Sequence, residues 1–332
     1  MRSPTSTDTT GYARLLVPLD GSPLSEKALP AAQQVARASQ GTMVLARVHI
    51  PAIIGTDAGW LPPHWEAEVR ESEREYLDKI GRQVSSEAGV PVDTVLLEGT
   101  PGEAISRHAG QAGVQLIVAS TSGRTGLSRA WIGSTADWLV RFAPVPVLLV
   151  RPPAEGVPTA WPGRHVLVPL DGSERAEKIL PDALRLARVG HARLTLLRVV
   201  PPVARSFGAY GSPGATASRD EQRTLDVMRE AKDALEHIVE RLRHDAPGLQ
   251  VETEVIASES VAGAILERAR DASVDAVAMC SRGRGASRLL LGSVADKLLR
   301  SFDGVLLLLG PVALREMESD WILEEEEVAF GE

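Results

Sequence analysis

A short turn motif, Asp-Gly-Ser, occurs twice in the chain, each time directly after an apolar, strand-like run. It reads Asp20-Gly21-Ser22 in the first half and Asp171-Gly172-Ser173 in the second. A carboxylate at the end of a strand can accept hydrogen bonds from a ribose or a similar polyol. The aspartate can instead order the turn while the serine caps the following helix. Local chemistry leaves both interpretations open.

A second candidate site is the loop Ser120–Thr135, which is rich in small residues and ends in Gly133-Ser134, where a helix is expected to begin. Backbone N–H groups in such a loop, together with the positive end of the helix dipole, can bind an anion. Arg124 and Arg129 could add positive charge. The simpler alternative is a flexible loop that ends in a serine or threonine N-cap. The loop matches neither a Walker motif nor the dinucleotide-binding glycine pattern.

Both motifs belong to an internal repeat. Leu15–Ser22 and Val166–Ser173 agree at seven of eight positions and are separated by 151 residues. Gly133–Asp137 matches Gly292–Asp296 at a separation of 159 residues. Two matching blocks in the same order, with loop-sized length changes between them, indicate a duplicated domain. A period of this length is far too long for a solenoid repeat.

The segment between the two halves is rich in proline, which keeps a linker extended and semi-rigid. We therefore expect five parts in the chain: a disordered leader (residues 1–12), a first domain (13–151), a linker (152–163), a second domain (164–311) and an acidic tail (312–332).

Each half alternates apolar strand-like runs with helical periodicity. The first half predicts strands at Ala13–Leu19, Thr42–His49, Val92–Leu97, Val114–Ala119 and Val145–Val150. Its predicted helices are Leu24–Gln40, with Gly41 as the C-cap, then Trp65–Ala88, Gly102–Ala112 and Ser134–Phe142. The second half predicts strands near His165–Leu170, Leu194–Val200, Gln250–Ile256, Ala276–Cys280 and Val305–Leu309, with a long helix near Asp220–His244.

Strands that are apolar throughout and alternate with helices predict a parallel sheet covered on both faces. The expected fold class is therefore α/β, with two tandem, doubly wound, five-stranded domains. Ligands of such sheets bind beyond the carboxyl ends of the strands, where the strand order reverses. This rule points to the turn after the first strand and the loop after the fourth.

The composition of the chain argues against several classes of function. Nearly all of the net charge of −8 comes from the last twenty residues, which carry eight acids and one arginine. The nearly neutral body is unlike a nucleic-acid-binding surface, and the tail is expected to be a solvated extension. No run is long and apolar enough to span a membrane, and the polar first ten residues lack the apolar core of a signal peptide. A single cysteine fits a cytoplasmic protein.

The strand–Asp-Gly-Ser opening, together with the late G-x2-G-x9-G-[ST] loop, resembles the universal stress protein family, here as a tandem fusion. The resemblance covers residues 13–151 and 164–310. It implies an adenine nucleotide alpha hydrolase-like fold with strand order 3-2-1-4-5 and pairing of domains through the last strand. One branch of the family binds ATP, and another lacks the loop and binds none.

Carried over to this chain, the resemblance implies that the cofactor is ATP or another adenine nucleotide, with Mg²⁺ as an optional companion. In the first half it would contact Asp20, Val48, Ser120, Gly123, Arg124, Gly133, Ser134 and Thr135. Ser120 stands where the family has the loop's first glycine. If that position required a left-handed backbone, serine would cost about 1–2 kcal/mol.

The second half departs further from the motif. Its candidate site residues are Asp171, Val199, Gly283, Gly292 and Ser293. Cys280 replaces the first glycine, and the spacing between the last two glycines is one residue shorter. We therefore expect the first half to bind nucleotide better than the second.

Catalytic chemistry finds little support in the sequence. No histidine has the spacing of a metal site, and each is expected at the surface or at a helix flank. Cys280 could be a reactive thiol beside arginines, or simply a small residue at the end of a buried strand. We predict no catalytic residue and no metal site. The predicted function is a cytoplasmic regulator of the stress response that binds adenine nucleotide, hydrolyses it slowly at most, and acts through unidentified protein partners.

Two alternative functions stay open. The protein could bind no nucleotide and act by protein association, or it could be an enzyme of the wider adenine-nucleotide α/β class. The assembly also stays open, since the chain could be an intramolecular pseudo-dimer that stays monomeric or one that dimerises again.

Overall fold

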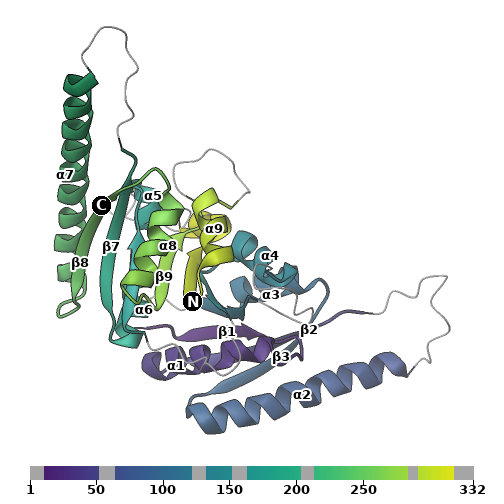
Figure 1. Cartoon of the computed structure of the whole chain (residues 1–332). Coiled ribbons are helices and arrows are strands. Elements are labelled where there is room, and N and C mark those ends of the chain that lie inside the picture. Colours follow the sequence, from purple (N-terminus) through teal and green to yellow (C-terminus); the bar gives the residue numbers. More distant parts are fainter. Residues whose placement is uncertain are drawn as a thin grey trace, which may run out of the picture. The chain divides into compact units, whose positions relative to one another are not determined.

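The computed structural model describes residues 11–51, 64–121, 132–151, 163–202, 213–282 and 291–317. These residues form two compact units. Of the described residues, 163–202, 213–282 and 291–304 belong to the second unit, and the others belong to the first. The predicted α/β fold class is confirmed for both halves (Figure 1).

The first unit is built on five parallel strands. They are β1 (Arg14–Pro18), β2 (Thr42–His49), β3 (Val92–Glu98), β4 (Leu116–Ser120) and β5 (Val147–Val150). Their order is β3-β2-β1-β4-β5, as the resemblance implies. The sheet core is apolar on both faces, since Leu15, Leu16, Leu45 and Ile117 are all fully buried.

Helices cover both faces of this sheet. The short 3₁₀ helix η1 (Ser25–Ala28), α1 (Leu29–Ser39) and α2 (Trp65–Ala88) lie on one face, and α3 (Pro101–Gln111) and α4 (Ser134–Phe142) lie on the other (Figure 1). This arrangement follows from the order of the strands, because right-handed crossovers that run in opposite directions place their helices on opposite faces.

The expected helix Leu24–Gln40 differs in detail. It is divided into η1 and α1, and its left-handed C-cap is Gln40 (φ 49°) rather than Gly41. Glycine is required at position 41 for another reason. A Cβ atom there would lie 2.2 Å from the carbonyl oxygen of Tyr12, so no side chain fits.

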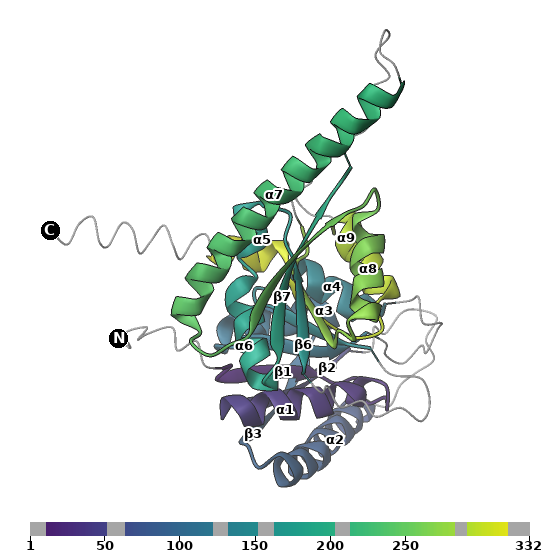
Figure 2. The same ribbon diagram turned by 60° about the vertical axis from the view of Figure 1, so that its left-hand side comes forward.

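The second unit repeats the plan with four parallel strands. They are β6 (His165–Pro169), β7 (Arg193–Val200), β8 (Val251–Ala257) and β9 (Ala276–Cys280), in the order β9-β6-β7-β8. Its helices are α5 (Glu174–Glu177), α6 (Leu180–Gly190), α7 (Pro213–Asp245), α8 (Val261–Asp271) and α9 (Ser293–Ser301). Helix α7 begins earlier than the expected Asp220, and Figure 2 shows it following β7 and β8 and continuing beyond the strand ends.

In the sheet order, the fifth strand of the second half stands next to β9, which gives this half the predicted order 3-2-1-4-5. β10 (Val305–Leu309) pairs antiparallel with β5, with Leu307 opposite Leu148, and is grouped with the first unit. Pairing through the last strand is the arrangement that the family resemblance implies.

The acidic tail starts differently from the expectation. Residues 311–317 are helical, and Ala313 and Leu314 are buried, so this part is not a solvated extension. The rest of the tail, most of the leader and nearly all of the linker lie outside the described residues.

Candidate functional site

A cavity of about 690 Å³ lies at the carboxyl ends of the first unit's strands. Its lining includes Leu19 and Asp20, which follow β1, and Ser120, which ends β4. Because β1 and β4 are neighbours at the reversal of strand order, this is the position where doubly wound sheets bind ligands. Its volume is within the range of small-molecule sites.

One wall of the cavity is the beginning of α4, where Gly133, Ser134, Thr135 and Ala136 line the space. The amide of Gly133 donates to the carbonyl oxygen of Thr121 at 2.9 Å, which fixes the start of the helix against the end of β4. The next amides are in the first helical turn and have no partner within the helix. Within the described residues, no side chain caps this turn. This wall therefore presents N–H donors and a positive dipole to the cavity.

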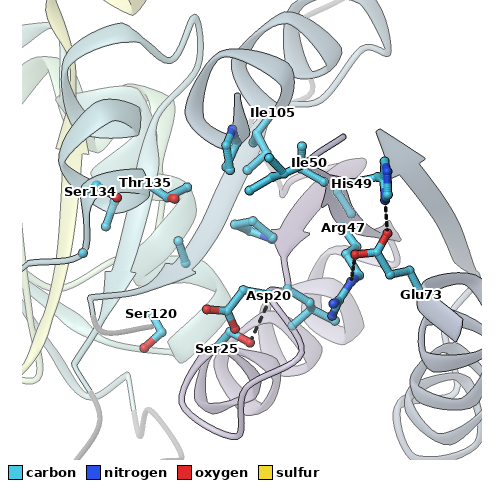
Figure 3. Close-up of a pocket in the computed structure, with 18 of the residues that line it drawn as sticks. Asp20, Ser25, Arg47, His49, Ile50, Glu73, Ile105, Ser120, Ser134 and Thr135 are labelled. Carbon is cyan, nitrogen blue, oxygen red and sulfur yellow. Dashed lines mark hydrogen bonds and ion pairs between the residues drawn. The ribbon is translucent and has the colours of Figure 1, made fainter. Parts of the chain in front are cut away.

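Asp20 lies between this wall and the opposite side of the cavity (Figure 3). Its Oδ1 accepts hydrogen bonds from the amide of Ser22 at 2.9 Å and from the Ser22 hydroxyl at 2.6 Å. The aspartate thus orders the turn, as one of the two interpretations expected. It also faces the cavity, so the structure is compatible with both interpretations at once.

The opposite wall is charged and comes from β2 and α2. Arg47 donates from Nε to Glu73 at 3.2 Å, and His49 contacts the other oxygen of Glu73 at 2.7 Å (Figure 3). The Arg47 guanidinium also lies over Gly21, whose φ is +83°, and a Cβ there would come within 2.2 Å of Arg47 Nη1. Glycine in the Asp-Gly-Ser turn therefore provides both the left-handed backbone and the room for this arginine.

Apolar side chains complete the lining. Ile50 and Trp65 are 61% and 36% exposed, and both border the cavity together with Val69 and Ile105. Large apolar groups with this exposure beside polar groups are typical of ligand sites.

Six of the residues proposed for the first half line this one cavity: Asp20, Val48, Ser120, Gly133, Ser134 and Thr135. Gly123 and Arg124 lie outside the described residues. Ser120 is the last residue of a regular strand and does not have positive φ, so the strain considered for a left-handed serine does not arise.

Sequence reasoning missed the charged wall formed by Arg47, His49 and Glu73. The expectation that every histidine lies at the surface or a helix flank is wrong for His49 and His165, which are 1% and 3% exposed. The available signal was the pair of polar residues two positions apart at the end of an otherwise apolar strand. Residues at this spacing share one face of the sheet.

The second unit keeps the turn but changes what surrounds it. Asp171 Oδ1 accepts from the amide and the hydroxyl of Ser173, as Asp20 does from Ser22. Val199 lies in β7, while Gly292 caps α9 and Ser293 begins it. Gly283 lies outside the described residues.

Cys280 is a buried structural residue. Its thiol donates to the carbonyl oxygen of Arg175, and burial raises its pKa to about 12. The thiol is therefore protonated at neutral pH, which excludes the reactive-thiolate alternative.

The sheet order defines each half as a doubly wound α/β domain, and the cavity of the first half lies where such domains bind ligands. The model of the universal stress protein family matches residues 11–151 and again 163–308. The chain belongs to the universal stress protein family, as a tandem member.

Individual relatives of the chain are universal stress proteins as well. The universal stress protein YxiE of Bacillus subtilis is 31% identical over 147 residues, which is 42% of this chain and 99% of that protein. A universal stress protein of Methanocaldococcus jannaschii is 32% identical over 146 residues, 43% of this chain and 84% of that protein. Each of these relatives therefore matches a stretch of the size of one half of the chain.

Two solved structures match over most of the chain. A universal stress protein from Archaeoglobus fulgidus superposes with a TM-score of 0.62 and 19% identity, over 90% of this chain and 98% of that one. A putative universal stress protein from Pseudomonas aeruginosa gives a TM-score of 0.59 at 19% identity, over 92% and 96% of the two chains. At this identity the likeness concerns the fold alone.

Two properties of the described residues bear on location and metal binding. None of the helices there is long and apolar enough to cross a membrane. The same residues contain no cluster of three or more histidine, cysteine or acidic side chains placed to hold a metal ion.

Proposed function

We propose that the first domain binds ATP or another adenine nucleotide in the cavity between β1 and β4, and that the protein works as a nucleotide-dependent regulator of the stress response. The observation that carries this proposal is the start of α4. Its uncapped first turn faces a cavity that also contains a carboxylate, Asp20, on the opposite side. A nucleotide has the two chemical groups that suit such a site, an anionic phosphate and a ribose with two hydroxyls.

The nucleotide has a defined orientation in the cavity. The phosphates lie at Gly133, Ser134 and Thr135, and the ribose lies near Asp20. The base lies toward Val48 and the apolar wall. Mg²⁺ can accompany the phosphates, as it does for nucleotides in general.

Fast catalysis is not part of this proposal. His49 and Glu73 are the side chains in the cavity best suited to activate a water molecule, but they are held by each other at 2.7 Å. A general base must be able to reach the proton that it takes. We expect hydrolysis to be slow at most, with the effect of the nucleotide passed on through protein partners in the cytoplasm.

The test uses a carboxylate placed where the phosphates are expected. Thr135 is half-buried in the first turn of α4, where an acidic side chain is favourable for the helix, so Thr135→Glu should fold normally. Repulsion between this carboxylate and the phosphates should weaken ATP binding at least tenfold, or roughly 1.4 kcal/mol. Isothermal titration calorimetry on the whole chain measures the change.

Val294→Glu is the matched control, because Val294 has the same position in α9 of the second domain. We expect this variant to bind ATP with the affinity of the parent protein. Equal binding by the parent protein and by Thr135→Glu would contradict the proposed site, and equal weakening in both variants would contradict the preference for the first domain.

The alternative function is that of a universal stress protein that binds no nucleotide and acts by protein association. Asp20 favours it, because one of its oxygens is already used inside the turn. The absence of binding heat for ATP, ADP and AMP, together with protein purified free of nucleotide by native mass spectrometry, would establish this alternative.

A further inference from the structure

His49 connects the end of β2 to the first three turns of α2. Its side chain is 2% exposed. Nδ1 lies 2.7 Å from an oxygen of Glu73, and Nε2 lies 2.5 Å from an oxygen of Glu66. Glu66 and Glu73 are seven residues apart, so they lie on the same face of the helix. The imidazole ring is thus held between two carboxylates from one helix.

This geometry defines the protonation state of the ring. An ionised carboxylate only accepts hydrogen bonds, so each ring nitrogen must carry a hydrogen to make both contacts. A neutral imidazole has one N–H and one lone pair, and its lone pair would face a carboxylate oxygen. Both contacts are therefore satisfied only by the imidazolium form of His49.

The charged groups around the ring support the same assignment. Arg47 from β2 pairs with Glu73 at 3.2 Å, and Arg70 from α2 lies 3.6 Å from Glu66. Arg70 also pairs with Glu98 at the end of β3, at 3.0 Å. Positive and negative groups alternate along this cluster. It contains three carboxylates and two arginines, so a cationic His49 balances the charge.

Arg47, His49 and Glu73 of this cluster themselves line the cavity. Trp65, Val69 and Ser72, from the same turns of α2, line the cavity beside His49 itself. Asp20 and Glu68 add two further carboxylates to the lining. A change in the ring's charge therefore acts both on the position of α2 and on the potential that an anionic ligand meets.

We propose that His49 is a pH-dependent latch, which holds the first turns of α2 against the cavity when protonated and releases them when neutral. Glu66 is the contact that is lost, because Arg47 keeps Glu73 in place on the other side of the ring. His49 is thus a positioning residue for the cavity. Provided that the cavity binds nucleotide as proposed above, nucleotide affinity is higher when the ring is protonated than when it is neutral.

The latch itself is tested without any ligand, by hydrogen exchange of the whole chain at pH 6.0 and pH 8.5. Rates are divided by the intrinsic rates at each pH, since exchange is base-catalysed. We expect the protection of peptides that cover residues 65–73 to fall at least fivefold at the higher pH. Peptides from the C-terminal half of α2, which holds the buried Leu77 and Val84, should keep their protection.

Two variants separate the latch from a general effect of pH. The amide of Glu66→Gln can donate as well as accept, so it can bond His49 in either ring state, and protection should no longer depend on pH. Glu71→Gln is the control, since Glu71 is an exposed residue of the same helix that pairs with Arg74. It should behave as the parent protein does. Equal protection at both pH values in the parent protein, or the same fall in Glu66→Gln, would overturn the proposal.

Calorimetry with ATP at the same two pH values then tests the consequence for the ligand. We expect affinity in the parent protein and in Glu71→Gln to fall at least fivefold at pH 8.5, with a smaller fall in Glu66→Gln. Absence of ATP binding at both pH values would overturn the proposed function alone, because the hydrogen-exchange result stands without a ligand. A pH-dependent latch with pH-independent ATP binding would overturn the coupling of the latch to the cavity.

Discussion

In both domains a long helix packs on the second strand of the sheet, α2 on β2 and α7 on β7. The two helices bury corresponding apolar residues, such as Leu77 and Leu235, or Val84 and Leu242. Toward their N-terminal ends they differ. With these positions aligned, Glu73 of the first domain corresponds to Ala231 of the second, and Tyr76 to Ala234. At the end of the strand, His49 corresponds to Val200.

One member of the charged wall is present in both domains. Arg47 corresponds to Arg198, and each guanidinium lies over the glycine of its Asp-Gly-Ser turn, Gly21 or Gly172. Arg47 pairs with Glu73 and stacks 5.2 Å from the ring of Tyr76, whereas Arg198 donates to the carbonyl oxygen of Leu170. The first copy thus places a His49–Glu73 pair beside this arginine, where the second copy has Val200 and Ala231 at the corresponding positions. The duplicated fold fixes the arrangement of strands and turns, and a few side-chain replacements decide the chemistry beside the turn.

The largest expected effect comes from removing the centre of the cluster. Glu73→Ala leaves Arg47 and His49 without their shared partner, and both are largely buried. An unpaired buried charge is costly, so the free energy of unfolding of the first domain should fall by about 3 kcal/mol. Urea unfolding followed by hydrogen exchange of β2 and α2 peptides measures this domain separately.

The double variant His49→Val with Glu73→Ala sharpens this prediction, because it installs the residues of the second domain at both positions. We expect it to be more stable than Glu73→Ala alone, since an apolar replacement of a buried ionic group is often neutral. Glu71→Ala on the exposed side of α2 is the control and should change stability by less than about 0.5 kcal/mol. A loss in Glu73→Ala no larger than in this control would show that the cluster does not stabilise the domain.

A second comparison concerns the two aspartates of the repeated turn. Asp20→Ala and Asp171→Ala each remove two hydrogen bonds from the following serine, so both should cost their own domain about 1–2 kcal/mol. Only Asp20→Ala should also weaken ATP binding, by roughly tenfold, which corresponds to about 1.4 kcal/mol. Thermal unfolding and calorimetry on both variants separate the structural role from the binding role. Equal weakening of ATP binding by the two substitutions would contradict the preference for the first domain.

Much of this architecture could be predicted from the sequence. Helices α2 and α4 and strand β9 have the predicted bounds, because their apolar periodicity and flanking turn residues agree locally. The partner of β10 could not be predicted, since a short apolar strand carries no information about which neighbour it pairs with. The resemblance alone pointed to pairing through this strand.

Likewise, only some residues of the candidate site could be predicted from the sequence. Asp20, Gly133 and Ser134 could be found because they lie in motifs that the chain repeats. The cluster around His49 depends on long-range contacts between a strand and a helix that begins sixteen residues later, and His49, Glu66 and Glu73 form no local motif. A histidine can be buried when side chains distant in the sequence pair with its ring nitrogens. The expectation of a surface position did not consider such long-range partners.

The smallest expected effect concerns the second domain's own buried histidine, which has the opposite environment to His49. His165 Nδ1 contacts the carbonyl oxygen of Ala272 at 3.2 Å, and Nε2 contacts the hydroxyl of Thr195 at 2.8 Å. A neutral ring satisfies both, donating to the carbonyl and accepting from the hydroxyl. Burial, followed by the charge of Arg193, lowers the pKa of His165.

The sign of the resulting pH dependence follows from linkage. Because the pKa of His165 is lower in the folded state, the unfolded chain takes up this proton first as pH falls below the ordinary range of histidine, and stability is lost there. The Gln side chain of His165→Gln can keep one donor and one acceptor contact without titrating, so the acid-unfolding midpoint of the second domain should shift slightly to lower pH. Hydrogen exchange of β6 and β7 peptides between pH 7 and pH 5 measures this shift, with His237→Gln on the exposed face of α7 as the control. If the second domain unfolds at the same acidic pH in the parent protein, in His165→Gln and in His237→Gln, protonation of His165 does not destabilise this domain. The proposed difference between His165 and His49 would then be wrong.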